Sequence, residues 1–282
     1  MIMKKISIVL IFIIASTQLV WAGFPIGYGR YLIIPGYNYY NAKGYWNSDR
    51  AYSAYKSGSF SSHYFGIYGG YGIGRRLDFL YSVPFVVQVD NNTSGDSKIN
   101  TTAGLGDAKL GLSYFFNDFD NNNHVSLTGS VIIPLYQNST NSALPIIGFQ
   151  SLGAELKLGF AGTATGGFKN PYYDIEFGVR QFFTDGGPTQ LFANVTGGVP
   201  ISDTWKIAGT ISGVNSVSSS AKSTSSAVFY NYNKSFDYIR IAANIGKTIN
   251  DNVSIWGGIY TDIAGRSVGR GSGLSLSAVI KF

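Results

Sequence analysis

Charged side chains recur at alternate positions in several segments of this chain. The set comprises Asp107, Lys109, Glu155, Lys157, Asp174, Glu176, Arg180 and Arg240. Residues two apart on a β-strand point to the same face, so each segment would present its charges to one surface. If the polar faces of these strands share one lumen, opposite charges either pair across it as a structural network that helps to fill it, or create a field that sorts solutes by charge and dipole.

Apolar residues fill the positions between these charges, which predicts amphipathic strands. Leu110, Leu112 and Tyr114 alternate with polar residues, and the segment 274–282 alternates in the same way. No helical spacing of apolar residues competes with this period of two. We expect twelve strands, at residues 29–40, 61–73, 77–88, 105–116, 124–134, 151–161, 172–183, 189–199, 205–215, 236–248, 253–262 and 272–282.

The connections between these strands differ in length in a regular way. The first, third, fifth and ninth strands are followed by long polar segments, whereas short turns such as Gly74-Arg75-Arg76 follow the even strands. Outer-membrane barrels have an even number of strands, short periplasmic turns and longer extracellular loops. The pattern therefore predicts an all-β protein, an antiparallel transmembrane β-barrel of about twelve strands with both termini in the periplasm.

The N-terminus has the features of a cleavable signal peptide. Lys4 and Lys5 precede a short apolar run, and Val20-Trp21-Ala22 provides small residues for cleavage after Ala22. We expect a signal peptide at 1–22 and a barrel at 23–282. The chain has no cysteine, so lipoprotein processing at this site is excluded.

The composition fits a location in a bacterial outer membrane. The chain contains 36 Gly, 20 Tyr and 19 Phe but only 13% charged residues, whereas soluble domains average about 25%. The net charge of +6 would fall by two on loss of Lys4 and Lys5, which is too weak and dispersed to indicate nucleic acid. A periplasmic β-sandwich is the alternative, but its apolar face would need a partner layer in the same molecule.

The aromatic residues and the histidines each allow a structural interpretation as well as a functional one. Tyrosines crowd the first strand and loop, either as an interfacial girdle or as a stacking surface for a solute. His124-Val125-Ser126 has the His-x-Ser spacing of the outer-membrane phospholipase family, but Leu127-Thr128 follow where that family has Asn-Gly. We therefore expect no enzyme activity. Nothing in the sequence indicates a metal or a cofactor.

Two segments resemble known outer-membrane proteins. Ile280 and Phe282 match the C-terminal assembly signal of such barrels, with Ser277 where a glycine is usual. This resemblance implies recognition by the barrel-assembly machinery. Gly104-Leu105-Gly106-Asp107-Ala108-Lys109-Leu110-Gly111-Leu112 resembles the "GxGD…LG" strand of an outer-membrane transporter group that includes barrels associated with the meta-cleavage pathway of phenol degradation. That resemblance implies passage of small hydrophobic or aromatic compounds.

Three functions remain open from the sequence. The first is a passive channel for small solutes, constricted by the inward charges. The second is a closed structural barrel whose long loops bind a surface partner, and the third and most remote is a lipid hydrolase. In each case the lipid bilayer of the outer membrane is the expected surrounding.

Overall fold

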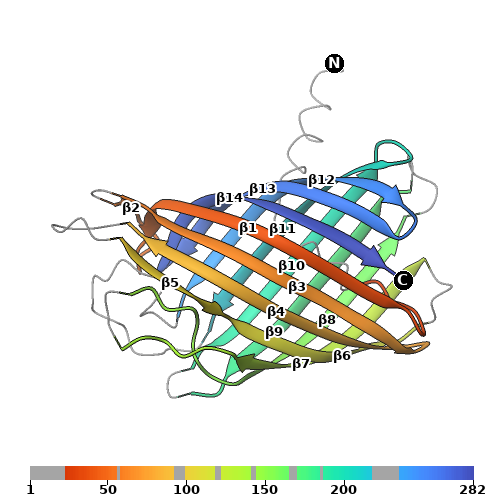
Figure 1. Cartoon of the computed structure of the whole chain (residues 1–282), viewed down its shortest axis with the longest axis horizontal. Helices are drawn as coiled ribbons and strands as arrows, with labels where there is room; N and C mark the ends of the chain where they lie inside the picture. Colours follow the sequence, from red (N-terminus) through yellow and green to blue (C-terminus); the bar gives the residue numbers. More distant parts are fainter. Residues whose placement is uncertain are drawn as a thin grey trace.

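The computed structural model describes residues 23–282 except 56–57, 92–98, 118–121, 141–143, 165–169, 185–186 and 218–234. In this part of the chain the strands form one antiparallel sheet, which closes where β14 (Val268–Lys281) pairs with β1 (Tyr31–Trp46). Figure 1 shows the resulting barrel of tilted strands. The described residues contain no helix that is long and apolar enough to cross a membrane. The predicted signal peptide at 1–22 lies outside them.

The sheet follows the order of the chain, with two local additions. β2 (Tyr52–Ala54) only extends the pairing of β1, and β5 (Asn100–Leu105) and β6 (Asp107–Phe115) both pair with β4 (Leu77–Asp90), so that they act as one barrel strand. The prediction of a twelve-stranded antiparallel barrel is therefore confirmed. The other strands are β3 (Phe60–Gly74), β7 (Asn123–Pro134), β8 (Gly153–Thr163), β9 (Tyr172–Phe182), β10 (Thr189–Pro200), β11 (Trp205–Ser216), β12 (Asp237–Asn250) and β13 (Val253–Arg266).

The largest differences from the predicted strands lie at one end of the barrel. β1 continues to Trp46 instead of ending near residue 40, and it pairs there with the beginning of β14 at Val268. β13 and β14 are joined by Ser267 alone, which adopts a left-handed conformation with φ 53°. The polar alternation weakens in these extensions, so sequence periodicity predicted these strands too short at this end. We call this end the loop end.

The opposite end, which we call the turn end, carries short turns such as the one after Gly74, and the C-terminus. The turn between Gly74 and Leu77 lies there, and Tyr31 exchanges backbone hydrogen bonds of 2.7 and 3.1 Å with Phe282. In Figure 1 the C-terminus lies at the end of the barrel opposite β2 and β5. The barrel rule for loop length assigns the turn end to the periplasm.

Large apolar side chains cover the outside of the barrel wall. Leu112 is 50% exposed, and Leu274 and Leu276 are each 55% exposed. Ser113, the residue after Leu112, points inward and is buried. Apolar side chains exposed on nearly every strand form a surface that suits lipid rather than water.

Aromatic rings inside the barrel lie over glycines of the neighbouring strand. Gly246 faces Trp256 in the register, and a methyl group added at Gly246 would lie 2.4 Å from the Trp256 ring. Gly198 and Tyr172 are paired in the same way, with 2.3 Å between the added carbon and the ring. The high content of glycine and tyrosine thus has a packing reason, since each ring needs the space that its glycine leaves.

The turn end of the lumen contains an apolar core. Ile26, Tyr68 and Tyr172 pack against a buried cluster of Leu32, Ile34, Ala208, Trp256 and Val279. These residues come from nearly opposite walls, because β3 and β9 lie far apart around the barrel. We call this set the turn-end core. It lies inside the barrel on the predicted periplasmic side.

The assembly-signal hypothesis makes a prediction that separates biogenesis from stability. The ring of Phe282 is 59% exposed and stacks on Tyr31, at 5.4 Å between centroids, so it adds little to the folded barrel. Deleting Phe282 should reduce the barrel recovered from outer membranes severalfold, while refolding of the purified chain in detergent stays as in the wild type. Phe282→Tyr keeps the aromatic end and should assemble normally. Equal losses in cells and in detergent would contradict the hypothesis.

Candidate functional site

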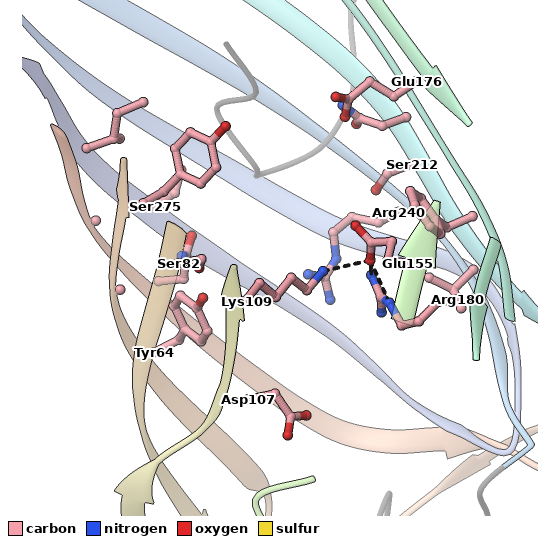
Figure 2. Close-up of a pocket in the computed structure, with 18 of the residues that line it drawn as sticks. Tyr64, Ser82, Asp107, Lys109, Glu155, Glu176, Arg180, Ser212, Arg240 and Ser275 are labelled. Carbon is pink, nitrogen blue, oxygen red and sulfur yellow. Dashed lines mark hydrogen bonds and ion pairs between the residues drawn. The ribbon is translucent and has the colours of Figure 1, made fainter. Parts of the chain in front are cut away.

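The barrel encloses a cavity of about 550 Å³ between the turn-end core and the loop end. Its lining is a mixture of charged, tyrosine and small polar side chains, and Figure 2 shows these side chains pointing into it from several strands. Of the eight charged residues that the sequence singles out, all except Asp174 line this cavity. They are Asp107, Lys109, Glu155, Lys157, Glu176, Arg180 and Arg240.

Glu155 is the centre of a three-residue charge cluster. Its Oε2 accepts hydrogen bonds from Lys109 Nζ at 2.8 Å and from Arg180 Nε at 2.7 Å. In Figure 2 the two cations converge on the carboxylate from β6 and β9. The Arg180 guanidinium also lies over the Phe192 ring, 5.2 Å from its centroid. Two cations share one carboxylate, so this cluster carries a net positive charge.

Two further pairs neutralise themselves. Lys157 Nζ donates to Glu176 Oε1 at 2.5 Å. Arg240 donates two hydrogen bonds, of 2.7 and 3.2 Å, to Asp262, and the side chain of Asp262 is fully buried. The Arg240 guanidinium also lies 4.4 Å from the centre of the Tyr260 ring, a distance typical of a cation–π contact.

These pairs run along the wall rather than across the lumen. Arg180 and Glu155 are direct partners in the register of β8 and β9, and Arg240 and Asp262 are paired across β12 and β13. Lys109 reaches Glu155 over a single intervening strand, β7. The sequence interpretation had the network pairing across the lumen and helping to fill it. The observed pairing leaves the middle of the barrel open as the cavity.

Asp107 anchors a loop at the loop side of the cavity. The Tyr136 hydroxyl donates to Asp107 Oδ1 at 3.0 Å and accepts a hydrogen bond from the Gln150 backbone N–H at 2.9 Å. Burial raises the pKa of the Tyr136 hydroxyl above its usual range, so the hydroxyl stays protonated and keeps donating. The loop between β7 and β8 is thereby tied to the wall.

The glycine-rich motif before Asp107 produces a break in the wall. Gly106 separates β5 from β6, and its N–H donates to the Pro84 carbonyl at 2.8 Å. A methyl group added at Gly106 would lie 3.0 Å from the Pro84 ring. Three residues, 106–108, stand opposite two on β4, between the partners Phe85–Leu105 and Ser82–Lys109. This irregularity turns Asp107 and Lys109 into the cavity.

Asp174 lies deeper than the cavity, at the turn end. It is 1% exposed, and its Oδ2 is 3.4 Å from the backbone nitrogen of Gly23. Asp78 is also 1% exposed and accepts a hydrogen bond of 2.8 Å from the Ile26 N–H. The sequence reading missed Asp78 and Asp262, although both stand at inward positions of predicted strands.

The aromatic and histidine side chains divide between the two faces. Tyr37 and His63 share a hydrogen bond of 2.9 Å, and Tyr37 packs on the exposed Phe65, whereas Tyr40 is buried beside Tyr260. The first-strand tyrosines therefore lie on both faces of the barrel wall, and Tyr40 lines the cavity.

The His-x-Ser pair lies inside the barrel. Ser126 is 1% exposed, and a methyl group added at Gly159, on the adjacent strand, would lie 2.6 Å from its hydroxyl. His124 packs against Phe24 and Phe115. Within the described residues the His124 Nδ1 has no hydrogen-bond partner. Both residues are thus remote from lipid substrates.

Comparison with known proteins gives the fold. No protein-family model matches the chain, and no curated protein matches its sequence. An outer membrane channel of the COG4313 group from Pseudomonas putida F1 has a similar structure, with a TM-score of 0.75 and 11% identity over 95% of this chain and 100% of that one. The NanC porin is also similar, with a TM-score of 0.50 and 8% identity over 89% of this chain and 100% of the porin. The chain is an outer-membrane barrel in fold, and its apolar exterior agrees with a bacterial outer membrane.

Proposed function

We propose that this barrel is a passive channel for small solutes. The observation that carries the proposal is the cavity of about 550 Å³, which is lined by charged and tyrosine side chains inside a closed wall. A purely structural barrel of this size would gain stability by filling the same space with packed side chains. The similar fold of a solved outer membrane channel supports the proposal.

The lining favours solutes with one aromatic ring and a polar or charged substituent. Tyr64, Tyr238 and Tyr260 supply ring faces and edges for stacking. The net positive Glu155 cluster supplies donors for a carboxylate or phenol oxygen. A cavity near 550 Å³ falls within the ~300–1,000 Å³ typical of small-molecule sites. The resemblance of the segment 104–112 to the phenol-degradation barrel group points to the same class of solute.

Solute uptake by proteoliposomes tests the proposal. Vesicles that contain the folded barrel should take up 4-hydroxybenzoate several times faster than protein-free vesicles. Cyclohexanecarboxylate, which has similar size and charge but no aromatic ring, should enter more slowly, and a trisaccharide should be excluded. A correctly folded barrel that admits none of these solutes would overturn the proposal and favour a closed interaction barrel.

A further inference from the structure

Three phenylalanine rings meet at the loop end of the barrel. Phe149, from the loop between β7 and β8, packs edge-on against Phe182 of β9, with 4.5 Å between ring centroids. It also stacks on Phe236, the residue before β12, at 6.4 Å and an interplanar angle of 20°. None of the three rings belongs to the lining of the cavity. We call this set the mouth cluster.

A row of planar groups continues from the mouth cluster into the cavity. Phe236 stacks on Tyr238, with 6.3 Å between centroids and an interplanar angle of 7°. The Arg240 guanidinium lies 5.3 Å from the centre of the Tyr238 ring and 4.4 Å from that of Tyr260. Tyr260 stacks in turn on Tyr40, at 6.3 Å and 12°. We call this sequence the aromatic row; it comprises Phe149, Phe236, Tyr238, Arg240, Tyr260 and Tyr40.

The outermost ring of the row is held in place through its two neighbours in the chain. The Gln150 N–H donates to the Tyr136 hydroxyl at 2.9 Å, and this hydroxyl donates to Asp107. A methyl group added at Gly148 would lie 3.0 Å from Asp107 Oδ2, so the loop also packs closely on the carboxylate. Phe149 lies between these two anchored residues. The loop therefore presents its ring at the mouth without burying it in a core.

The rings of the row are only partly covered, unlike those of a packed core. Phe149, Phe236 and Tyr238 each keep part of their surface exposed, whereas Trp256 of the turn-end core is 1% exposed. Nearly parallel rings with exposed surface offer successive stacking positions to a flat solute. Passage through a channel needs several sites that bind well enough to admit the solute and weakly enough to release it. The row has the form of such a series.

We propose that the mouth cluster is the entry site for the aromatic ring of the solute, and that the aromatic row passes this ring to the cavity. The proposal rests on the proposed channel function and adds the route that the solute follows. The ring meets Phe149 and Phe236 first and Tyr238 next. Its anionic substituent reaches the Glu155 cluster in the cavity. A saturated ring of similar size gains burial but no stacking on this route, so the row favours flat rings.

The preference of uptake for an aromatic over a saturated ring tests this route. The measured quantity is the ratio of the initial rates at which proteoliposomes take up 4-hydroxybenzoate and cyclohexanecarboxylate at low concentration. Phe149→Leu and Phe236→Leu keep an apolar side chain without a ring, and each should lower this ratio at least ~threefold, as expected for one lost stacking partner. Phe183→Leu is the matched control, because the Phe183 ring is 64% exposed at the same end of the barrel; its ratio should equal that of the wild type.

Tyr136→Phe tests whether the anchored loop positions Phe149. This variant removes the hydroxyl between Gln150 and Asp107 but leaves every ring of the row, so the ratio should fall as it does in Phe149→Leu. The double variant should have the same ratio as Phe149→Leu alone, since two changes that act through one ring are not additive. A further fall in the double variant would show that Tyr136 acts elsewhere and would contradict its positioning role.

Binding to the folded barrel in detergent separates the entry site from the channel. Saturation-transfer NMR measures the affinity of 4-hydroxybenzoate without any transport, and Phe236→Leu should weaken this binding severalfold. Ring-dependent binding in a barrel that takes up neither solute would support the entry site and refute the channel. Uptake with the same ratio in the wild type, Phe149→Leu and Phe236→Leu would refute the entry site and leave the channel standing. Neither uptake nor ring-dependent binding would refute both.

Discussion

Replacing Trp256 by Ala is expected to lower the free energy of unfolding by about 3–5 kcal/mol, the range for removing a large buried aromatic side chain. The Trp256 side chain is 1% exposed and belongs to the turn-end core with Leu32 and Val279. Its ring also covers Gly246, which has no side chain to fill the space left behind. The measurement is urea unfolding of the barrel in phospholipid vesicles, followed by far-UV circular dichroism.

Trp205→Ala is the matched control for that experiment. Trp205 stands on the outer surface near the turn end, is 39% exposed, and contacts Lys247 at 5.3 Å from the ring centre. An interfacial tryptophan loses contact with headgroups rather than leaving a cavity, so its loss should cost less than half as much. If both variants were equally destabilised, the turn-end core would not be the main source of stability at this end of the lumen.

The barrel itself could be predicted because its signals are local. Alternation along Leu110–Tyr114 or Leu274–Ile280 reports which face meets lipid, and the turn at residues 74–76 shows where the chain reverses. Each of these features occupies only a few consecutive residues. The extensions of β1 and β14 were harder to predict from the sequence, since they depend on pairing between Trp46 and Val268 at opposite ends of the chain.

The composition of the candidate site depends on register, which alternation alone does not give. Asp262 pairs with Arg240 because the hairpin between β12 and β13 contains register shifts that bring the two opposite each other. The short turn at Asn250-Asp251-Asn252 indicates that the strands of Arg240 and Asp262 are adjacent, but it does not give their register. Gly23 and Asp174 are 151 residues apart in the chain, and the segment before β1 has no periodicity. Only the folded barrel brings them together.

Removing the carboxylate of Glu155 should make the channel markedly more selective for anions. Lys109 and Arg180 share this carboxylate, so Glu155→Gln leaves two cations at the cavity wall without a counter-charge. A unit charge 4 Å from an ion contributes ~4 kcal/mol at an effective dielectric constant of 20. Even a third of that energy would change the ratio of chloride to potassium permeability about tenfold. Reversal potentials under a KCl gradient measure this ratio.

Charge-matched variants show whether the effect is electrostatic. Lys109→Gln leaves the pair of Arg180 and Glu155 neutral and should shift selectivity towards cations. The double variant Lys109→Gln with Glu155→Gln restores the wild-type net charge of the cluster, and its selectivity should return close to the wild-type value. Selectivity is read from single openings, so the result does not depend on how often the channel opens. A double variant as anion-selective as Glu155→Gln would mean that the shape of the cavity, rather than the charge on its wall, decides which ions pass.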